Sequence, residues 1–427
     1  MKLQNSLFFT LISLLIISCS DRERSNPLDP LNPKTGGIPS SLFLYSDKKK
    51  VYMSWSKTND INISHYNIWG KTESEDEFEF ISSIADTVTH IFTEVSEYDQ
   101  RYEFAISIVS SDEYETPYSE PQSIVPGPYN YWISDYYQGL LLKISYDGAH
   151  VINEKIIYFP VDLDVYSNEG TLWLAINYPP QLQKFDANGE SLIIVDLPGN
   201  PSGLTINQSS GDVFVSIEGH RELLVFSNTG DQLPSLNTSI SLSRNTNLAI
   251  DSTNSLVWIS VQDSNKVIKM NYSSGTIDTI FSNFYYPGKI KISYDLEVTC
   301  IATDSGLVMI HLDNTHTLFF KDSRIIDLDI NRAKNEFWMI VFRENEFQWD
   351  IEILSKQDGN WSPEQQPFST EENYLYLTSI TVNPDIENPG ILLHEAYTSK
   401  LVRLDESGKV IGSMSSFSSR LSMGIEW

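Results

Sequence analysis

The stretch PSGLTINQSSGDVFVSIEGHRELLVFSNTG, from Pro201 to Gly230, decides the fold of most of this chain. Three short runs in it alternate apolar and polar residues, and turns rich in Gly, Ser and Asn separate them. Alternation with a period of two is typical of strands that bury one face. The stretch therefore predicts consecutive antiparallel strands with short connections.

The same unit recurs from Tyr129 to the end of the chain. Its best-marked strand reads, in successive copies, YWISD, LWLAI, VFVSI, VWISV, TCIAT, FWMIV and ILLHE. The first five steps between these strands are 41, 41, 44, 42 and 38 residues, and the last step, of 54, contains an insertion. A repeat of about 40 residues suits the four-stranded blade of a β-propeller.

The two ends of the repeated region complement each other. A further alternating run precedes each strand pair except the first, whereas the final run, LSMGIEW at 421–427, has no pair after it. We therefore predict an all-β chain in which residues 129–427 form a seven-bladed β-propeller, closed when strand 421–427 joins the first blade. Six blades are the alternative, if the region after Glu336 forms no separate blade.

The unit at 201–230 resembles an NHL repeat, and the whole array resembles the propellers of NHL and YVTN lipoproteins. Most other copies lack the proline and glycine that precede the first strand of this unit. The resemblance implies a propeller that works through the loops at the mouth of its central channel.

Residues 38–126 have a different texture, with about seven alternating runs such as KVYMSW and RYEFAISIVSS. Seven short strands in this length indicate a β-sandwich. Trp55, Tyr66, Trp69 and Tyr102 resemble the fibronectin type III pattern, with Tyr102 where that family has its tyrosine corner. No Arg-Gly-Asp loop is present, so the resemblance implies a spacer domain.

The N-terminus reads as a targeting segment. Lys2 precedes an apolar run from Leu7 to Ile17, which is too short to span a bilayer. The residues that end in Cys19 resemble the bacterial lipobox, which implies a signal peptide at 1–18 and lipidation of Cys19. Ser20 follows, which favours the outer membrane in that family. The alternatives are an ordinary signal peptide with an incidental thiol, or a buried cysteine of the folded domain.

The segment 19–37 carries charges and prolines but few apolar residues. It cannot bury enough surface to offset its ordering entropy, and its prolines favour an extended spacer. We expect an outer-membrane lipoprotein of the bacterial cell envelope, tethered by this segment and facing the periplasm or the outside.

The composition excludes several classes of partner. The chain has 57 acidic and 29 basic residues, a formal net charge of -28. Nucleic acids and anionic lipids need a concentrated positive surface, so we expect neither as a partner. Cys300, the second of two cysteines, lies in an alternating strand and is expected to be a buried apolar residue. No cofactor or metal is expected.

The loops between the second and third strands of each blade are expected to form the recognition surface. They carry tyrosines, carboxylates and amides, which suit a protein or glycan partner. The ligand-binding candidates are Tyr136, Tyr137, Tyr178 and Tyr397. The membrane itself is expected as a partner only through the lipid anchor.

A propeller enzyme, a lyase or a lactonase-like hydrolase, is the alternative. Its candidate groups are the pairs Glu218 with His220 and His394 with Glu395, on the third and seventh blades. The sequence has no HExxH, no phosphate-binding glycine loop and no Gly-x-Ser-x-Gly motif. We therefore assign no catalytic residue and favour binding over catalysis.

Overall fold

A computed structural model describes residues 29, 32, 39, 42–58, 63–293, 295–332, 334–357, 359–364, 368–370, 374–382 and 390–426. Cys19, the segment 1–18 and nearly all of 19–37 lie outside these residues. The described chain consists of β-strands with a single short 3-10 turn at Gln262–Ser264. Within it, no helix has the length and apolar character that a membrane span needs. The chain divides into two compact units at Ile124/Val125, with the turn Ser46–Lys49 grouped with the second.

The first unit contains two antiparallel sheets. One has the order β1 (Leu42–Asp47), β2 (Lys50–Trp55), β5 (His90–Glu94), and the other β4 (Glu79–Ala85), β3 (Ile63–Thr72), β6 (Tyr102–Ser110), β7 (Gln122–Ile124). One apolar cluster fills the space between them, where the rings of Trp55 and Tyr66 lie 5.4 Å apart. The Tyr102 hydroxyl accepts a hydrogen bond from the backbone N–H of Glu97 at 3.1 Å.

The second unit, here called the ring unit, contains seven four-stranded antiparallel sheets among its described residues. Sheet 1 consists of β8 (Asn130–Asp135), β9 (Leu140–Ile144), β10 (Val151–Ile156) and β35 (Leu421–Glu426); sheet 2 of β11 (Pro160–Tyr166), β12 (Thr171–Asn177), β13 (Pro180–Phe185) and β14 (Ser191–Asp196); sheet 3 of β15 (Pro201–Ile206), β16 (Val213–Ile217), β17 (Glu222–Phe226) and β18 (Gln232–Asn237). Sheet 4 consists of β19 (Thr246–Asp251), β20 (Leu256–Val261), β21 (Lys266–Asn271) and β22 (Thr276–Ser282); sheet 5 of β23 (Ile290–Ser293), β24 (Val298–Thr303), β25 (Gly306–His311) and β26 (His316–Phe319); sheet 6 of β27 (Arg324–Asn331), β28 (Glu336–Arg343), β29 (Gln348–Gln357) and β30 (Asn360–Pro363); sheet 7 of β31 (Leu377–Val382), β32 (Gly390–Glu395), β33 (Lys400–Asp405) and β34 (Val410–Ser415).

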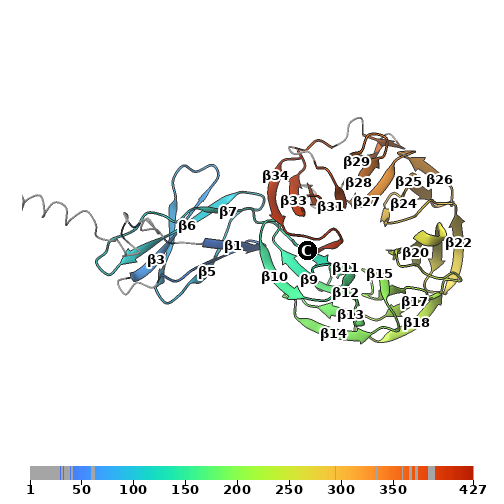
Figure 1. The fold of residues 1–427 in the computed structure, drawn as a ribbon, viewed down its shortest axis with the longest axis horizontal. Helices are drawn as coiled ribbons and strands as arrows, with labels where there is room; N and C mark the ends of the chain where they lie inside the picture. The colour runs from blue at the N-terminus through green and yellow to red at the C-terminus, as the bar shows by residue number, and fades with distance from the viewer. Residues whose placement is uncertain are drawn as a thin grey trace, which may run out of the picture. The chain divides into compact units, whose positions relative to one another are not determined.

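The seven sheets follow one another around a ring (Figure 1). Seven apolar clusters hold them, and each cluster joins two neighbouring sheets, including sheet 7 with sheet 1. The second strand of each sheet lies between two such clusters. This explains why strands such as β12 and β24 are buried over almost their whole length.

The C-terminal strand β35 pairs antiparallel with β8, from Leu421 opposite Asp135 to Glu426 opposite Asn130. This is the pairing that the unmatched runs at the two ends of the repeat predict. The region after Glu336 contributes to a sheet of its own, sheet 6. The described residues therefore form seven four-stranded sheets, as predicted, and not six.

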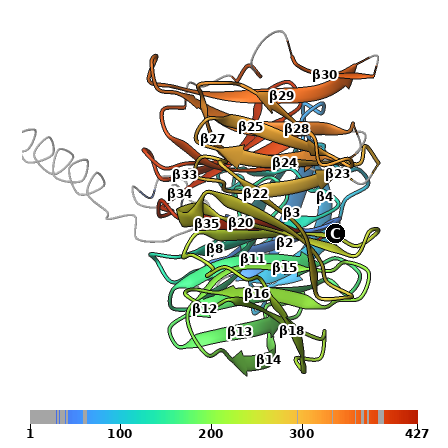
Figure 2. The ribbon, with the colours of Figure 1, turned by 90° about the vertical axis from the view of Figure 1, so that its right-hand side faces the viewer.

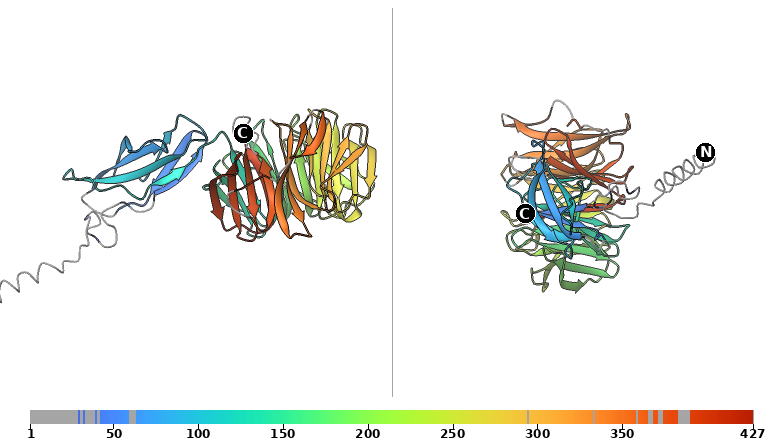
Figure 3. Two further views of the ribbon diagram at one scale, coloured as in Figure 1. Left: turned by 90° about the horizontal axis from the view of Figure 1, so that it is seen from above. Right: turned by 90° about the vertical axis from the view of Figure 1, so that its left-hand side faces the viewer.

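The first strands of the sheets, β35, β11, β15, β19, β23, β27 and β31, neighbour one another around the centre of the ring. Figure 2 and Figure 3 show the ring from its side, with the strands crossing its thickness. The register places two kinds of connection at opposite ends of each sheet. One end, the loop face, carries the loops between second and third strands and the connections from one sheet to the next. The other end, the turn face, carries the remaining turns.

Candidate binding face

Exposed aromatic side chains of the ring unit gather on the loop face. Among the described residues of this unit, the exposed aromatics are Tyr137, Tyr158, Phe159, Tyr178, Tyr285, Tyr286, Phe347, Tyr376 and Tyr397. All nine lie in loops between second and third strands or in connections between sheets. The described turns at the opposite end expose no aromatic side chain and are rich in Gly, Asn, Asp and Ser. The two faces are thus chemically different.

One aromatic cluster lies where sheets 1 and 2 meet. The ring of Tyr136 lies 5.0 Å from that of Tyr137 and 5.4 Å from that of Phe159. The guanidinium group of Arg420 lies over the Tyr136 ring at 4.4 Å. Sequence reasoning missed Phe159 and Arg420, because each belongs to a connection between sheets and only the folded ring brings it to Tyr136.

The other two candidate tyrosines are exposed on the same face. Tyr178 is 71% exposed and Tyr397 is 74% exposed, compared with 64% for Tyr137. The backbone N–H of Asn177, next to Tyr178, donates to the carbonyl oxygen of Phe159 at 3.1 Å. Neither Tyr178 nor Tyr397 takes part in the ring contacts found in the described chain. The tyrosines therefore share a face without forming one continuous stack.

A polar cavity of about 410 Å³ opens at the centre of this face. All seven first strands, or the residues just before them, contribute to its lining. Its charged residues are Asp162, Arg244, Lys289, Lys291, Asp327 and Arg420. Four of these residues are cations and two are carboxylates, and the carboxylates of Asp164 and Asp329 lie close to the lysines of the lining. A second cavity, of about 180 Å³, shares Asp162 and Lys289 and continues along the first strands.

The carboxylates in and beside the cavity accept hydrogen bonds from backbone N–H groups. Asp162 and Asp164 of β11 accept hydrogen bonds from the N–H groups of Leu204 and Ile206, at 3.0 and 2.9 Å. In the same manner Asp327 and Asp329 of β27 accept from Ile380 and Val382. The N–H groups belong to the first strand of the following sheet, which has no further strand beside it. These aspartates thus satisfy edge donors that would otherwise be left unpaired.

The cations differ in how far they are neutralised. Lys291 forms an ion pair with Asp329 at 2.6 Å. Burial lowers the pKa of Lys289, but the carboxylates of Asp162 and its neighbours Asp327, Asp329 and Asp164 outweigh burial and raise this pKa above its ordinary value. Burial raises the pKa of Asp164 and Asp327. Arg244 has no ion pair or hydrogen bond from its guanidinium group to any residue that the structure describes.

One of the two residue pairs that the enzyme alternative requires is buried. His394 is fully buried, its Nδ1 lies 2.5 Å from the Thr378 hydroxyl, and Glu395 is almost fully buried. Burial lowers the pKa of His394 to about 4, against the nearby carboxylates of Asp135 and Glu395. Thr378 lines the cavity, whereas His394 does not.

The other pair, Glu218 with His220, lies at the loop between β16 and β17 in sheet 3. No hydrogen bond or ion pair joins these two side chains within the described chain. Burial raises the pKa of the Cys300 thiol well above its usual range, as expected for an inert cysteine in an apolar interior. The described residues contain no cluster of His, Cys, Asp and Glu that could hold a metal.

The comparisons with known proteins describe the fold. No protein-family model matches the chain, and no curated protein matches it. A functionally unknown protein from Desulfotomaculum acetoxidans is similar in structure, with a TM-score of 0.58 and 13% identity over 70% of this chain and 99% of that one.

Two further solved structures are more distant. Hydrazine synthase from Kuenenia stuttgartiensis has a TM-score of 0.49 and 11% identity, and the match covers 58% of this chain and 76% of that one. A protein of unknown function from Bacteroides caccae has a TM-score of 0.47 and 11% identity, over 70% and 99% of the two chains. At these sequence identities the structural similarity describes the arrangement of strands and does not indicate an activity.

Proposed function

We propose that the ring unit is a seven-bladed β-propeller, similar to those of NHL and YVTN lipoproteins, whose loop face binds a protein or glycan partner without chemical turnover. The observation that carries this proposal is the confinement of the nine exposed aromatic side chains to one of two faces. Aromatic side chains supply large contact areas at small entropic cost, and they dominate the energetics of many interfaces. Their concentration on one face is what a partner-binding surface would show.

The rest of the chain supports presentation of that face. The first unit, with its two sheets and the Tyr102 to Glu97 hydrogen bond, suits a fibronectin type III-like spacer. We propose that Cys19 is lipidated and that the segment 19–37 tethers the protein to the outer membrane of a bacterial cell envelope. A tethered propeller would then meet partners in the periplasm or outside the cell.

Catalysis has less support. A catalytic group must reach a substrate, but His394 and Glu395 are buried behind the cavity wall. No hydrogen bond or ion pair joins the side chains of Glu218 and His220 in the part of the chain that the structure describes. The enzyme alternative therefore lacks a convergent pair of groups at the channel mouth.

The test is capture of envelope proteins and immobilised glycans by the purified full-length chain. Replacing Tyr137 and Tyr178 by alanine should weaken capture at least about tenfold, since a buried aromatic anchor contributes on the order of 2 kcal/mol. Leu192→Ala with Ile194→Ala is the matched control, because these exposed side chains lie on β14, away from the loop face. Equal capture by the tyrosine variant and the wild type would refute the proposal.

A further inference from the structure

We propose that the 410 Å³ cavity at the centre of the loop face binds an acidic sugar, meaning a hydroxylated ring that carries a carboxylate or sulfate group. The proposal goes beyond partner binding by the loop aromatics, because it concerns a small ligand in the channel and different residues. The volume of the cavity falls within the usual range of small-molecule sites, roughly 300–1,000 Å³.

The two arginines of the cavity favour an anionic ligand. Arg244 reaches the cavity without an ion pair to any described residue, and Arg420 reaches it from the opposite part of the chain while stacking on Tyr136. A guanidinium group offers a planar fork of N–H donors that matches the two oxygens of a carboxylate or sulfate. In a strongly acidic protein, two such groups at one cavity are a local exception that an anionic ligand would explain.

The rest of the cavity lining contains positively and negatively charged side chains. Lys289 lies there with the carboxylates of Asp162 and Asp327 near it. Each carboxylate accepts backbone hydrogen bonds from a neighbouring first strand, so it is engaged in holding the ring. The ligand's anionic group would consequently be drawn toward Arg244 or Arg420, away from these aspartates.

The neutral part of the lining selects hydroxyl groups. Asn247, Ser379 and Thr381 line the cavity, and their side chains form no hydrogen bond with the described residues. An amide and two hydroxyls can donate and accept in turn, as recognition of sugar hydroxyls requires. Few apolar side chains reach the cavity, among them Val161, Ile326 and Met423, which argues against an apolar ligand.

The experiment is calorimetric titration of the purified full-length chain with glucuronate, galacturonate and glucose 6-sulfate. Glucose, galactose, inorganic sulfate and inorganic phosphate serve as comparison ligands. We expect the acidic sugars to bind at least about tenfold more tightly than either the neutral sugars or the inorganic anions, because only they use both parts of the lining. Their affinity should fall as the salt concentration rises.

Arg244→Gln should raise the dissociation constant of the acidic sugars at least about tenfold, and Arg244→Gln with Arg420→Gln should abolish binding. Arg324→Gln is the matched control, since Arg324 is bonded to Asp304 at 2.7 Å and does not line the cavity. The Tyr137→Ala and Tyr178→Ala variant should keep its affinity for acidic sugars. This separates the cavity proposal from partner capture by the loop aromatics.

Four results would overturn the proposal. Equal binding of neutral and acidic sugars would remove the role of the arginines. Equal binding of inorganic sulfate or phosphate would reduce the cavity to a general anion site. No measurable binding of any acidic sugar, or equal losses in Arg244→Gln and Arg324→Gln, would show that the cavity has no such specificity.

Discussion

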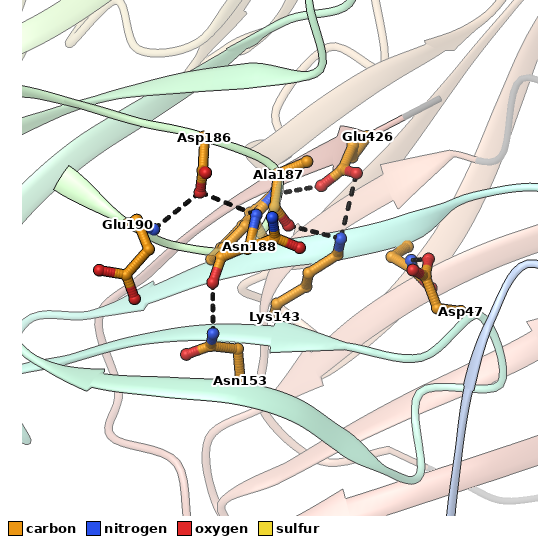
Figure 4. A network of polar contacts seen from close by, with 10 residues as sticks. Asp47, Lys143, Asn153, Asp186, Ala187, Asn188, Glu190 and Glu426 are labelled. Atoms are coloured by element: carbon orange, nitrogen blue, oxygen red, sulfur yellow. Dashed lines mark hydrogen bonds and ion pairs between the residues drawn. The ribbon is translucent and has the colours of Figure 1, made fainter. Parts of the chain in front are cut away.

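The ammonium group of Lys143 lies 3.1 Å from the carboxylate of Glu426, so that β9 is bonded to the last strand of the chain (Figure 4). Both side chains are buried, with exposed fractions of 4% and 6%. The second oxygen of Glu426 accepts a hydrogen bond from the Trp132 indole N–H at 2.7 Å, and Lys143 also donates to the carbonyl oxygen of Ala187 in sheet 2. One carboxylate next to the C-terminus therefore organises the junction of sheets 1 and 2.

Glu426→Ala should lower the free energy of unfolding by about 3 kcal/mol, because it leaves a buried ammonium group and an indole N–H without their carboxylate partner. Urea denaturation measures this loss. Glu406→Ala is the control, since Glu406 meets Lys334 at 3.4 Å in an exposed pair and should change stability by less than about 1 kcal/mol. Equal effects of the two substitutions would contradict the role given to Glu426.

Deletion of residues 421–427 removes β35 and leaves the backbone groups of β8 unpaired at an open seam. The same deletion uncovers the apolar cluster between sheets 7 and 1, against which Leu421, Met423 and Ile425 pack. We expect a large drop in melting temperature and rapid proteolysis within the ring unit. A truncated chain that melts at the parent temperature would show that closure contributes nothing.

Stability should depend on the protonation of His394. Its pKa is about 4 in the folded protein, compared with the ordinary value of 6.5 expected in the unfolded chain. Between these two pH values the unfolded chain therefore binds a proton that the folded chain does not. The free energy of unfolding therefore falls as the pH falls through this window, by about 2 kcal/mol between pH 7 and pH 5. Urea titrations of the wild type and of His394→Gln at both pH values measure the difference, and parallel pH profiles would disprove it.

Cys19→Ala should release the protein from the membrane fraction or leave the precursor unprocessed, because lipid chains on this residue would supply the membrane affinity. Fractionation of cells, with detection of the precursor and mature forms, measures both outcomes. The melting temperature of the ring unit should not change. Unaltered processing together with unaltered membrane association would exclude lipidation of Cys19.

The strand order of the ring unit could be predicted from the sequence because short apolar or alternating runs, separated by turn residues, recur at a repeat of about 40 residues. The pairing of 421–427 with the first copy also followed, since one unmatched run stood at each end of the repeat. These signals are local in the sequence or require only that the strands be counted. The loop tyrosines could be named as candidates because the strands on either side of each loop are recognisable.

The cavity could not be predicted in this way. Arg244, Lys289 and Arg420 come from connections before three different strands, and no spacing in the sequence marks them as neighbours. Only the circular arrangement of the first strands brings them to one opening. The aspartates of β11 and β27 are equally hidden, because an alternating polar position in a strand is ordinarily exposed to solvent.

One missed feature did have a signal in the sequence. Lys143, Lys184 and Lys269 each follow a tryptophan by eleven residues, and in the structure each lies over the ring of that tryptophan on the adjacent strand. The same lysines donate to a turn of the next sheet, at Ala187, Asn228 and Asn314. A search for conserved spacing between copies within this one chain would have found these links between sheets.

The pairing of β35 with β8 also constrains the order in which the protein can be completed. β8 is the first strand of the ring unit to leave the ribosome, and its partner is the last. Throughout the synthesis of the intervening sheets, one side of β8 has no neighbour, and an unpaired strand of this kind invites association with other chains. The ring can therefore close only after β35 has been synthesised, and a chain interrupted before β35 would present cellular quality control with a nearly complete ring that has one unpaired strand.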